Sequence, residues 1–185
     1  MSIYIHTTAI VDSQKIGEGS RIWAFVHILE NVNIGKNANI CDHCFIEGGV
    51  FIGDDVTIKC GVWIWNGVTI ENNVFVGPSV VFTNDVYPRS KNKVYKKENT
   101  LLKEGCSVGG NSTLIGGITI GRYAMVGAGS VVTKDVNDFE LVYGNPAKLK
   151  GYICKCGEKI EFKDRIIECP CGLKYKFEDG KISEI

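Results

Sequence analysis

Large apolar residues recur at every sixth position along the first half of the chain. The series begins at Tyr4, continues through eleven isoleucines and ends with Val76 and Phe82, which makes fourteen hexads. A helix repeats every 3.6 residues and a strand every two, so a period of six describes a short strand followed by a tight corner. The pattern predicts an all-β solenoid.

The same period returns in the second half, where six further hexads run from Leu102 to Val132. The twenty residues from Phe82 to Leu102 replace an interval of six, which predicts an inserted loop at about residues 85–101. Three sides close a triangular coil, so residue n stacks on residue n+18. Twenty hexads then form about seven coils, roughly 30 Å long at about 4.8 Å per layer.

Smaller residues support this packing and these corners. Inward positions four residues after each large one are small or β-branched, from Val26 to Ser130, which suits a narrow stacked core. The expected corners at residues 35–37 (GKN), 53–55 (GDD) and 71–73 (ENN) carry residue types that tolerate positive φ.

Composition excludes some partners. The 185 residues include 21 basic and 21 acidic side chains, so the net charge is zero and no basic surface for a nucleic acid or a membrane is expected. The chain enters the repeat almost at once, and no apolar stretch approaches the roughly 18 residues of a membrane span. We therefore expect a cytoplasmic protein.

Two closing motifs connect the repeat to a known family. The Ile-Gly corners, the run at residues 126–135 (VGAGSVVTKD) and the following residues 144–147 (GNPA) resemble the hexapeptide-repeat acyltransferases over residues 4–150. The resemblance implies a left-handed parallel β-helix, a homotrimer, and acyl-coenzyme A bound between subunits. It also implies that Asn145, Pro146 and Lys148 contribute to the coenzyme A site.

The entrance to the inserted loop narrows the resemblance. Residues 82–85 (FTND), the following Pro88-Arg89 and residues 21–27 (RIWAFVH) are similar to N-acetyltransferases that modify the 3-amino group of nucleotide-linked sugars for bacterial surface polysaccharides. Such an enzyme uses acetyl-CoA and a UDP- or dTDP-linked amino sugar. Long loops in compact proteins are often functional. The alternative for the loop lysines is a solvated excursion.

Counting by 18 places the candidate site residues in space. Asn66 lies beneath Asn84, Asn84 beneath Gly116, and Gly116 beneath Lys134. Gly116 and Gly117 would allow a ligand to approach the main chain, and Lys134 would meet a phosphate of coenzyme A. Trp65 lies beneath Thr83 and offers an aromatic wall for a sugar or a base. Asn ladders and corner glycines also occur on solenoid edges without function.

The residues at this edge favour direct acetyl transfer. The chain contains no Ser/His/Asp or Cys/His arrangement, and none of its three histidines falls in the Asn84 column. We expect Asn84 to orient a neutral amine and backbone N–H groups near Gly116 to hold the oxyanion, while Asp85 or the departing thiolate takes the proton. Arg89 is a candidate for the diphosphate or a carboxylate, or a plain surface arginine.

His27 heads the column formed with Phe45, Trp63 and Val81, too far from Asn84 for proton transfer within one subunit. Its expected role is structural or a contact with the nucleotide. The nearest catalytic alternative is an O-acetyltransferase, which would need a base at the site, typically a histidine, to activate a hydroxyl; the Asn84 column contains no histidine. A non-catalytic trimeric scaffold also fits the outward aromatic residues.

Eight cysteines divide into two groups. Cys44 and Cys106 fall at inward positions and are expected to pack, whereas Cys41 and Cys60 are expected outside or at corners, as inert thiols. The other four occur in a duplicated motif, with CKCGxKIxF at residues 154–162 and CPCGxKYxF at residues 169–177. Facing hairpins would bring Cys154, Cys156, Cys169 and Cys171 together as a Cys₄ zinc site; disulfides and unmodified thiols are the alternatives.

These patterns predict three segments. Residues 1–136 form the β-helix with its inserted loop, residues 137–150 connect, and residues 151–185 form a small zinc-ribbon-like appendage.

Overall fold

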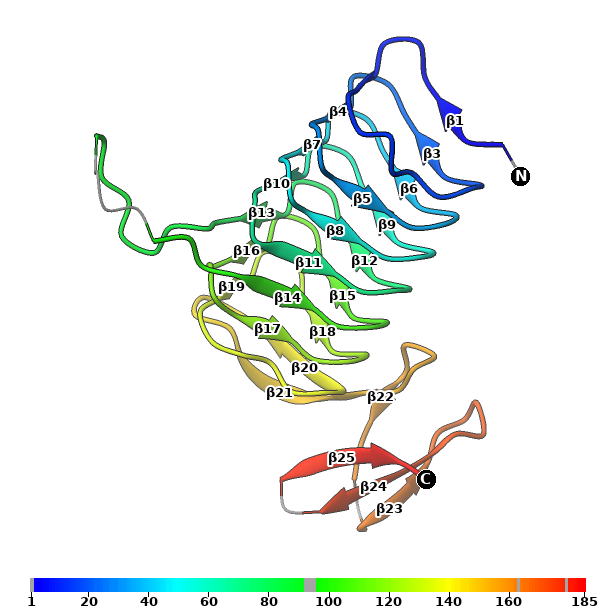
Figure 1. The fold of residues 1–185 in the computed structure, drawn as a ribbon. Helices are drawn as coiled ribbons and strands as arrows, with labels where there is room; N and C mark the ends of the chain where they lie inside the picture. Colours follow the sequence, from blue (N-terminus) through cyan, green and yellow to red (C-terminus); the bar gives the residue numbers. More distant parts are fainter. Residues whose placement is uncertain (1, 92–95, 163, 179) are drawn as a thin grey trace.

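The computed structural model describes residues 2–91, 96–162, 164–178 and 180–185. The chain winds as a triangular parallel β-solenoid whose three sides are three sheets, and a small antiparallel unit follows at the C-terminal end (Figure 1). Most solenoid strands contain two residues. The described residues include no helix long and apolar enough to cross a membrane.

The first side contains eight parallel strands: β1 (Tyr4–Ile5), β3 (Arg21–Ile22), β6 (Asn39–Ile40), β9 (Thr57–Ile58), β12 (Phe75–Val76), β15 (Ser107–Val108), β18 (Met125–Val126) and β20 (Glu140–Tyr143). The second side contains β2 (Ile10–Val11), β4 (His27–Ile28), β7 (Phe45–Ile46), β10 (Trp63–Ile64), β13 (Val81–Phe82), β16 (Thr113–Leu114) and β19 (Val131–Val132). The third side contains β5 (Asn33–Ile34), β8 (Phe51–Ile52), β11 (Val68–Ile70), β14 (Thr100–Leu102) and β17 (Thr119–Ile120).

The predicted stacking register is confirmed over most of the solenoid. Arg21 pairs with Asn39, Asn39 pairs with Thr57, and Thr57 pairs with Phe75, each eighteen residues apart. Phe82 pairs with Leu114, so the inserted residues leave the register intact on either side. The inward residues from Ile22 to Val132 are buried and form one continuous apolar core.

The first coil departs from the prediction. Ile5 pairs with Ile22 and Val11 pairs with Ile28, an interval of seventeen, so Tyr4 and Ile10 share the outward register of Arg21 and His27. The hexads that began at Tyr4 are therefore out of register before Ile16. The first coil is one residue short, so the apolar side chains of Tyr4 and Ile10 fall in the outward register. Because β20 extends the first side, that side has eight parallel strands, whereas the second side has seven.

The corners form polar ladders of their own. Asn37, Asp55 and Asn73 all have φ between 55° and 60°, as predicted for these residue types. The Lys36 N–H donates to Asp54 Oδ1 at 2.7 Å, and the Asp54 N–H donates to the side-chain oxygen of Asn72 at 2.8 Å. Corner amides are therefore satisfied by side chains from the next layer.

Four cysteines belong to the solenoid. Cys44 and Cys106 are buried as predicted, and burial raises the pKa of the Cys44 thiol to about 12, which opposes nucleophilic reactivity. Cys60 is exposed, and Cys41 lies at the corner that follows β6, where it is only 9% exposed. Desolvation by neighbouring residues also raises the pKa of Cys41.

The parallel ladder ends at β20, where the chain turns back as the antiparallel strand β21 (Lys148–Ile153) and continues into β22 (Lys159–Ile160). A separate antiparallel sheet follows, with β23 (Ile166–Glu168), β24 (Lys174–Glu178) and β25 (Lys181–Glu184). This C-terminal unit has a second apolar cluster, which includes Ile160, Tyr175 and Ile182 and also incorporates Phe139.

Candidate functional site

The corner after β13 carries the predicted catalytic residues. The side-chain amide of Asn84 donates to the carbonyl of Asn66 at 3.4 Å, and the indole N–H of Trp65 donates to the carbonyl of Phe82 at 2.9 Å. The Gly116 N–H donates to Thr83 Oγ1 at 2.9 Å. The predicted column from Asn66 through Asn84 to Gly116 is therefore confirmed as a spatial neighbourhood.

The inserted loop leaves and rejoins the solenoid at this corner. The Glu98 N–H donates to the carbonyl of Asn84 at 3.1 Å, and Lys97 Nζ donates to the side-chain oxygen of Asn66 at 2.8 Å. Glu98 is also paired with Lys96, with Nζ and Oε1 2.9 Å apart. The end of the loop thus brings a carboxylate and a cation to the Asn84 corner.

The stacking count applied to the sequence did not identify Glu98. It linked Gly116 to Asn84, which precedes the insertion, and left out the residues that follow the insertion. Val68 pairs with Thr100, so the same count of 32 that relates Phe82 to Leu114 relates Asn66 to Glu98. Both Asn84 and Glu98 therefore share the layer between Asn66 and Gly116. Subtracting eighteen from Gly116 would have identified Glu98 from the sequence.

The expected oxyanion donors are already engaged. The Gly116 N–H donates to Thr83 and the Gly117 N–H donates to Thr100 Oγ1 at 3.3 Å. A Cβ atom added to Gly116 would lie 2.8 Å from the carbonyl oxygen of Thr83 and 3.3 Å from Cβ of Glu98. A side chain at Gly116 would therefore meet Thr83 and Glu98 of the same chain, and the N–H groups of Gly116 and Gly117 already have acceptors within it.

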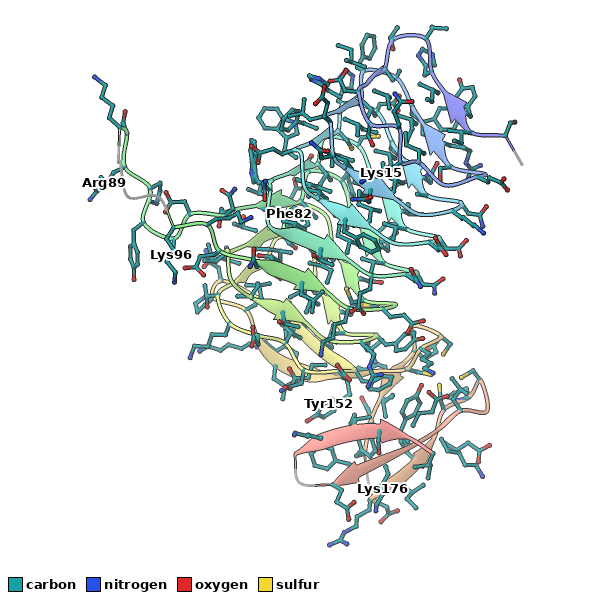
Figure 2. All side chains as sticks on the ribbon, viewed as in Figure 1. Lys15, Phe82, Arg89, Lys96, Tyr152 and Lys176 are labelled. Carbon is teal, nitrogen blue, oxygen red and sulfur yellow. The ribbon has the colours of Figure 1, made fainter. Side chains whose placement is uncertain are left out.

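Asp85 and Arg89 occupy different parts of the loop. Asp85 is half-buried next to Asn84, and its Oδ1 accepts a hydrogen bond from the Tyr87 N–H at 2.9 Å. Arg89 is exposed on the projecting part of the loop, away from the solenoid (Figure 2). Within one chain, Arg89 therefore does not lie next to Asn84. Residues 92–95 of the predicted insertion lie outside the described residues.

An aromatic groove lies on the second side of the solenoid, near the Asn84 corner. Its cavity measures about 680 Å³ and is lined by Phe25, His27, His43, Cys44, Phe45, Gly61, Trp63 and Trp65. The predicted column of His27, Phe45, Trp63 and Val81 is confirmed by strand pairing. Since the ring centroids of Trp63 and Trp65 are 6.2 Å apart, the groove extends from His27 to the wall of the candidate site.

The predicted coenzyme A residues gather near the last strand of the second side. Lys134 follows β19, and the turn that contains Asn145 and Pro146 is tied to that strand, because Ala147 N–H donates to the Val131 carbonyl at 2.8 Å. Lys148 opens β21 directly after the turn. All four of these candidate side chains are exposed.

The four C-terminal cysteines meet at the tips of two hairpins. Their Sγ atoms all lie within 4.8 Å of one another, with 3.5 Å between Cys154 and Cys171 and 3.7 Å between Cys156 and Cys169. A tetrahedral zinc site with Zn–S bonds of about 2.3 Å requires Sγ atoms about 3.8 Å apart. The donor set and its geometry fit a tetrathiolate metal site.

The local electrostatics also favour a cation. Burial tends to raise the pKa of Cys154, but hydrogen bonds from the Tyr175 hydroxyl and the Cys156 N–H outweigh it and lower the pKa to about 7. At Cys169 a backbone N–H favours the thiolate, yet desolvation and the neighbouring thiols raise the pKa to about 12. Four thiolates cannot coexist without a compensating positive charge.

Comparison with known sequences identifies the repeat. The model of the family "Bacterial transferase hexapeptide (six repeats)" matches residues 15–48 and 99–134. A protein of Aneurinibacillus thermoaerophilus named dTDP-3-amino-3,6-dideoxy-alpha-D-galactopyranose 3-N-acetyltransferase is 57% identical over 182 residues, covering 98% of this chain and 95% of the relative. The matched region therefore includes the loop insertion and the cysteine-rich unit.

Solved structures share the fold at low sequence identity. AntD, an N-acyltransferase from Bacillus cereus solved as a variant with dTDP-4-amino-4,6-dideoxyglucose and coenzyme A, has a TM-score of 0.67 at 20% identity, over 77% of this chain and 84% of that one. The acetyltransferase domain of PglB from Neisseria gonorrhoeae, solved with acetyl coenzyme A, has a TM-score of 0.58 at 20% identity, over 80% and 57% of the chains.

Proposed function

Because this chain belongs to the hexapeptide-repeat acetyltransferases, we propose that it transfers the acetyl group of acetyl-CoA to the 3-amino group of a dTDP-linked 3-amino-3,6-dideoxyhexose. The observation that carries the proposal is the 57% identity that extends over 98% of the chain. This relative favours dTDP over UDP and an amine at C3. The product would serve the cytoplasmic synthesis of a bacterial surface polysaccharide.

In the proposed reaction the neutral sugar amine attacks the thioester carbonyl. A C–N bond forms, the C–S bond breaks, and the coenzyme A thiol leaves after the amine has lost a proton. Asn84 orients the amine through its side chain, which belongs to the corner shared with Asn66. An amine is already nucleophilic, so the site needs a proton acceptor but no covalent intermediate.

Two carboxylates are candidates for that proton acceptor. Asp85 is adjacent to Asn84 in the chain, and Glu98 is attached to the Asn84 carbonyl through its backbone N–H. Glu98 has the further advantage that its side chain lies next to Gly116 and Gly117, where acetyl-CoA is proposed to pass. The departing thiolate is the remaining acceptor.

The two substrates are proposed to approach from different directions. Trp65, Asn66, Thr83 and His27 line or adjoin the aromatic groove and are proposed to hold the nucleotide-linked sugar. Acetyl-CoA is proposed to run from Gly116 and Gly117 towards Lys134, Asn145, Pro146 and Lys148, where two cations meet its phosphates.

A homotrimer would complete this site. Trp63 is 56% exposed and Phe25 is 57% exposed beside the groove, which is a large apolar surface for a single chain. Arg89 projects away from its own solenoid, so it is proposed to reach the nucleotide diphosphate at a neighbouring subunit (Figure 2). For the four clustered cysteines we propose a structural Zn²⁺ ion.

Residues 1–136 are proposed to act as the catalytic β-helix, residues 137–150 as a connection that contributes to coenzyme A binding, and residues 151–185 as the structural appendage. Two separate apolar clusters support a solenoid and an appendage as distinct units, with Val142 of the connection packed in the first cluster and Phe139 in the second. The acetyl donor and the sugar therefore contact the first two segments, and the metal belongs to the third.

The test compares Asn84→Ala with Asn33→Ala, an asparagine on the third side of the solenoid. Loss of the orienting amide should reduce kcat/KM for the amino sugar by about 100-fold, because small misplacements of a nucleophile are costly. The control should keep full activity, and both variants should keep the melting temperature of the wild type within a few degrees. Full activity in Asn84→Ala would remove this residue from the mechanism.

A further inference from the structure

Two turns carry the clustered cysteines, at residues 154–158 and 169–173, and we call them the cysteine knuckles. They have the same backbone hydrogen bond and are fifteen residues apart in the chain. In each knuckle the first cysteine N–H donates to a carbonyl four residues later, from Cys154 to Glu158 and from Cys169 to Leu173, both at 2.8 Å. The glycine after the second cysteine closes each turn with a positive φ of 94° or 91°. The sequence duplication therefore specifies two equivalent pairs of thiol ligands.

The copies differ at the positions that join them. Tyr175 in the second copy corresponds to Ile160 in the first, and Pro170 in the second corresponds to Lys155 in the first. The hydroxyl of Tyr175 lies 3.1 Å from Cys154 Sγ and accepts a hydrogen bond from the Lys155 N–H at 3.1 Å. The reverse link would need a hydroxyl at Ile160 and an N–H at Pro170, and neither residue has that group. The second knuckle is therefore bonded to the first through Tyr175, without a matching bond from the first to the second.

The ring of Tyr175 continues the link to the solenoid. Tyr175 is fully buried, and its ring packs edge-to-face against Phe139 with centroids 5.4 Å apart. Phe139 belongs to the last coil and stacks on Tyr123, a corner residue of the coil before it, at 5.6 Å. A continuous contact therefore runs from Cys154 through Tyr175 and Phe139 to Tyr123.

Backbone and charged groups follow the same path. The Ile153 N–H, directly before the first ligand, donates to the carbonyl of Phe139 at 2.8 Å. Lys155, between the first two ligands, is paired with Glu184 and lies 4.8 Å above the ring of Tyr123. Positions next to the metal ligands are thus the ones that contact the solenoid.

We propose that the metal fastens the C-terminal unit onto the last coil of the solenoid, with Tyr175 and Phe139 as the connecting contacts. The inference rests on the Zn²⁺ assignment proposed above and is independent of the acetyl-transfer chemistry. Zinc fixes Cys154 and Tyr175 in one arrangement, and Tyr175 holds Phe139 buried. Loss of zinc frees the second hairpin and exposes the aromatic column at the end of the solenoid.

The test uses the full chain prepared under reducing conditions, with zinc measured by elemental analysis and docking measured by hydrogen–deuterium exchange. Cys171→Ser removes an exposed ligand, and Cys60→Ser removes an exposed thiol outside the cluster as the matched control. The wild type and Cys60→Ser should bind about one zinc per chain. Cys171→Ser should lose it, and amide exchange at residues 137–156 should accelerate about tenfold or more while residues 27–64 stay unchanged.

Tyr175→Phe tests the connection without removing a ligand. Its loss of the hydroxyl near Cys154 should weaken zinc affinity by about 10–100-fold in competition with a chelator, and Tyr152→Phe should not. Zinc loss without faster exchange near Phe139 would overturn the docking role and leave the metal assignment intact. A wild type without zinc would overturn both. Acetyl transfer is assayed separately, so its failure would be recognised on its own.

Discussion

The solenoid and the C-terminal unit obtain their stability in different ways. In the solenoid the same packing arrangement is repeated in every coil. Each inward isoleucine or valine packs on its counterpart in the next coil, so the core lengthens with every layer. The C-terminal unit has about 35 residues and a small aromatic cluster, and chains of this size usually need a metal or cross-links. Repeated packing is enough to explain the order of the solenoid, whereas the appended hairpins are proposed to depend on a metal held by their four sulfur ligands.

The largest expected effect comes from breaking the solenoid stack. Ile46→Asp should leave no folded protein, because an unpaired charge would be buried between two neighbouring isoleucines. Circular dichroism and size exclusion measure the outcome.

Two matched variants serve as controls for the Ile46→Asp result. Thr57→Asp puts the same charge on an outward position and should fold, and Ile46→Val should lower the free energy of unfolding by about 0.5–1.5 kcal/mol. A soluble, cooperatively unfolding Ile46→Asp would refute the stacked core.

The next effect separates the two regions through their cysteines. Cys154→Ser should abolish zinc binding and loosen the C-terminal unit, while the solenoid keeps its thermal transition. Cys44→Ser changes a cysteine inside the solenoid and should leave zinc binding at the C-terminal unit intact. Its free energy of unfolding should fall by at most about 1–2 kcal/mol, because the new hydroxyl can donate to the nearby carbonyl of Lys59. Differential scanning calorimetry with zinc analysis distinguishes these results, and equal zinc loss in both variants would contradict the division.

A smaller effect concerns the carboxylates at the inserted loop. If Glu98 accepts the proton, Glu98→Gln should lower kcat by about 100-fold or more and Asp85→Asn should do so much less. The pH dependence of kcat in both variants provides the measurement. Equal and small losses in the two variants would leave the departing thiolate as the acceptor.

The smallest expected effect is at the coenzyme A phosphates. Lys134→Ala should raise the KM for acetyl-CoA by up to about fivefold, the range expected for an exposed charge pair, and added salt should reduce the difference. Lys36→Ala removes an exposed cation at a distant corner and should leave that KM unchanged. An equal KM in wild type and Lys134→Ala would remove this lysine from the coenzyme A site.

The hexad pattern predicted more of the solenoid than of the site. It correctly stacked Asn66, Asn84 and Gly116, because inward packing holds a strict register of eighteen. It failed at Tyr4, where a coil shortened by one residue leaves an apolar side chain outside.

The site depends on details that periodicity does not specify. The hydroxyl of Thr83 engages the Gly116 N–H through a side-chain rotamer, which the repeat does not determine. Glu98 was not predicted because the stacking count included the first end of the inserted loop, at Asn84, and left out its second end. The cysteine duplication, by contrast, specified its cluster fully, since two equivalent hairpins need only face each other.

The most direct test of the account is an acetyl-transfer assay with acetyl-CoA and dTDP-3-amino-3,6-dideoxygalactose, followed by mass spectrometry and by titration of released thiol. We predict a singly acetylated nucleotide sugar and one equivalent of coenzyme A thiol, with the rate strongly reduced in Asn84→Ala. Folded, zinc-loaded protein that acetylates neither this sugar nor any other nucleotide-linked amino sugar would contradict the proposed function.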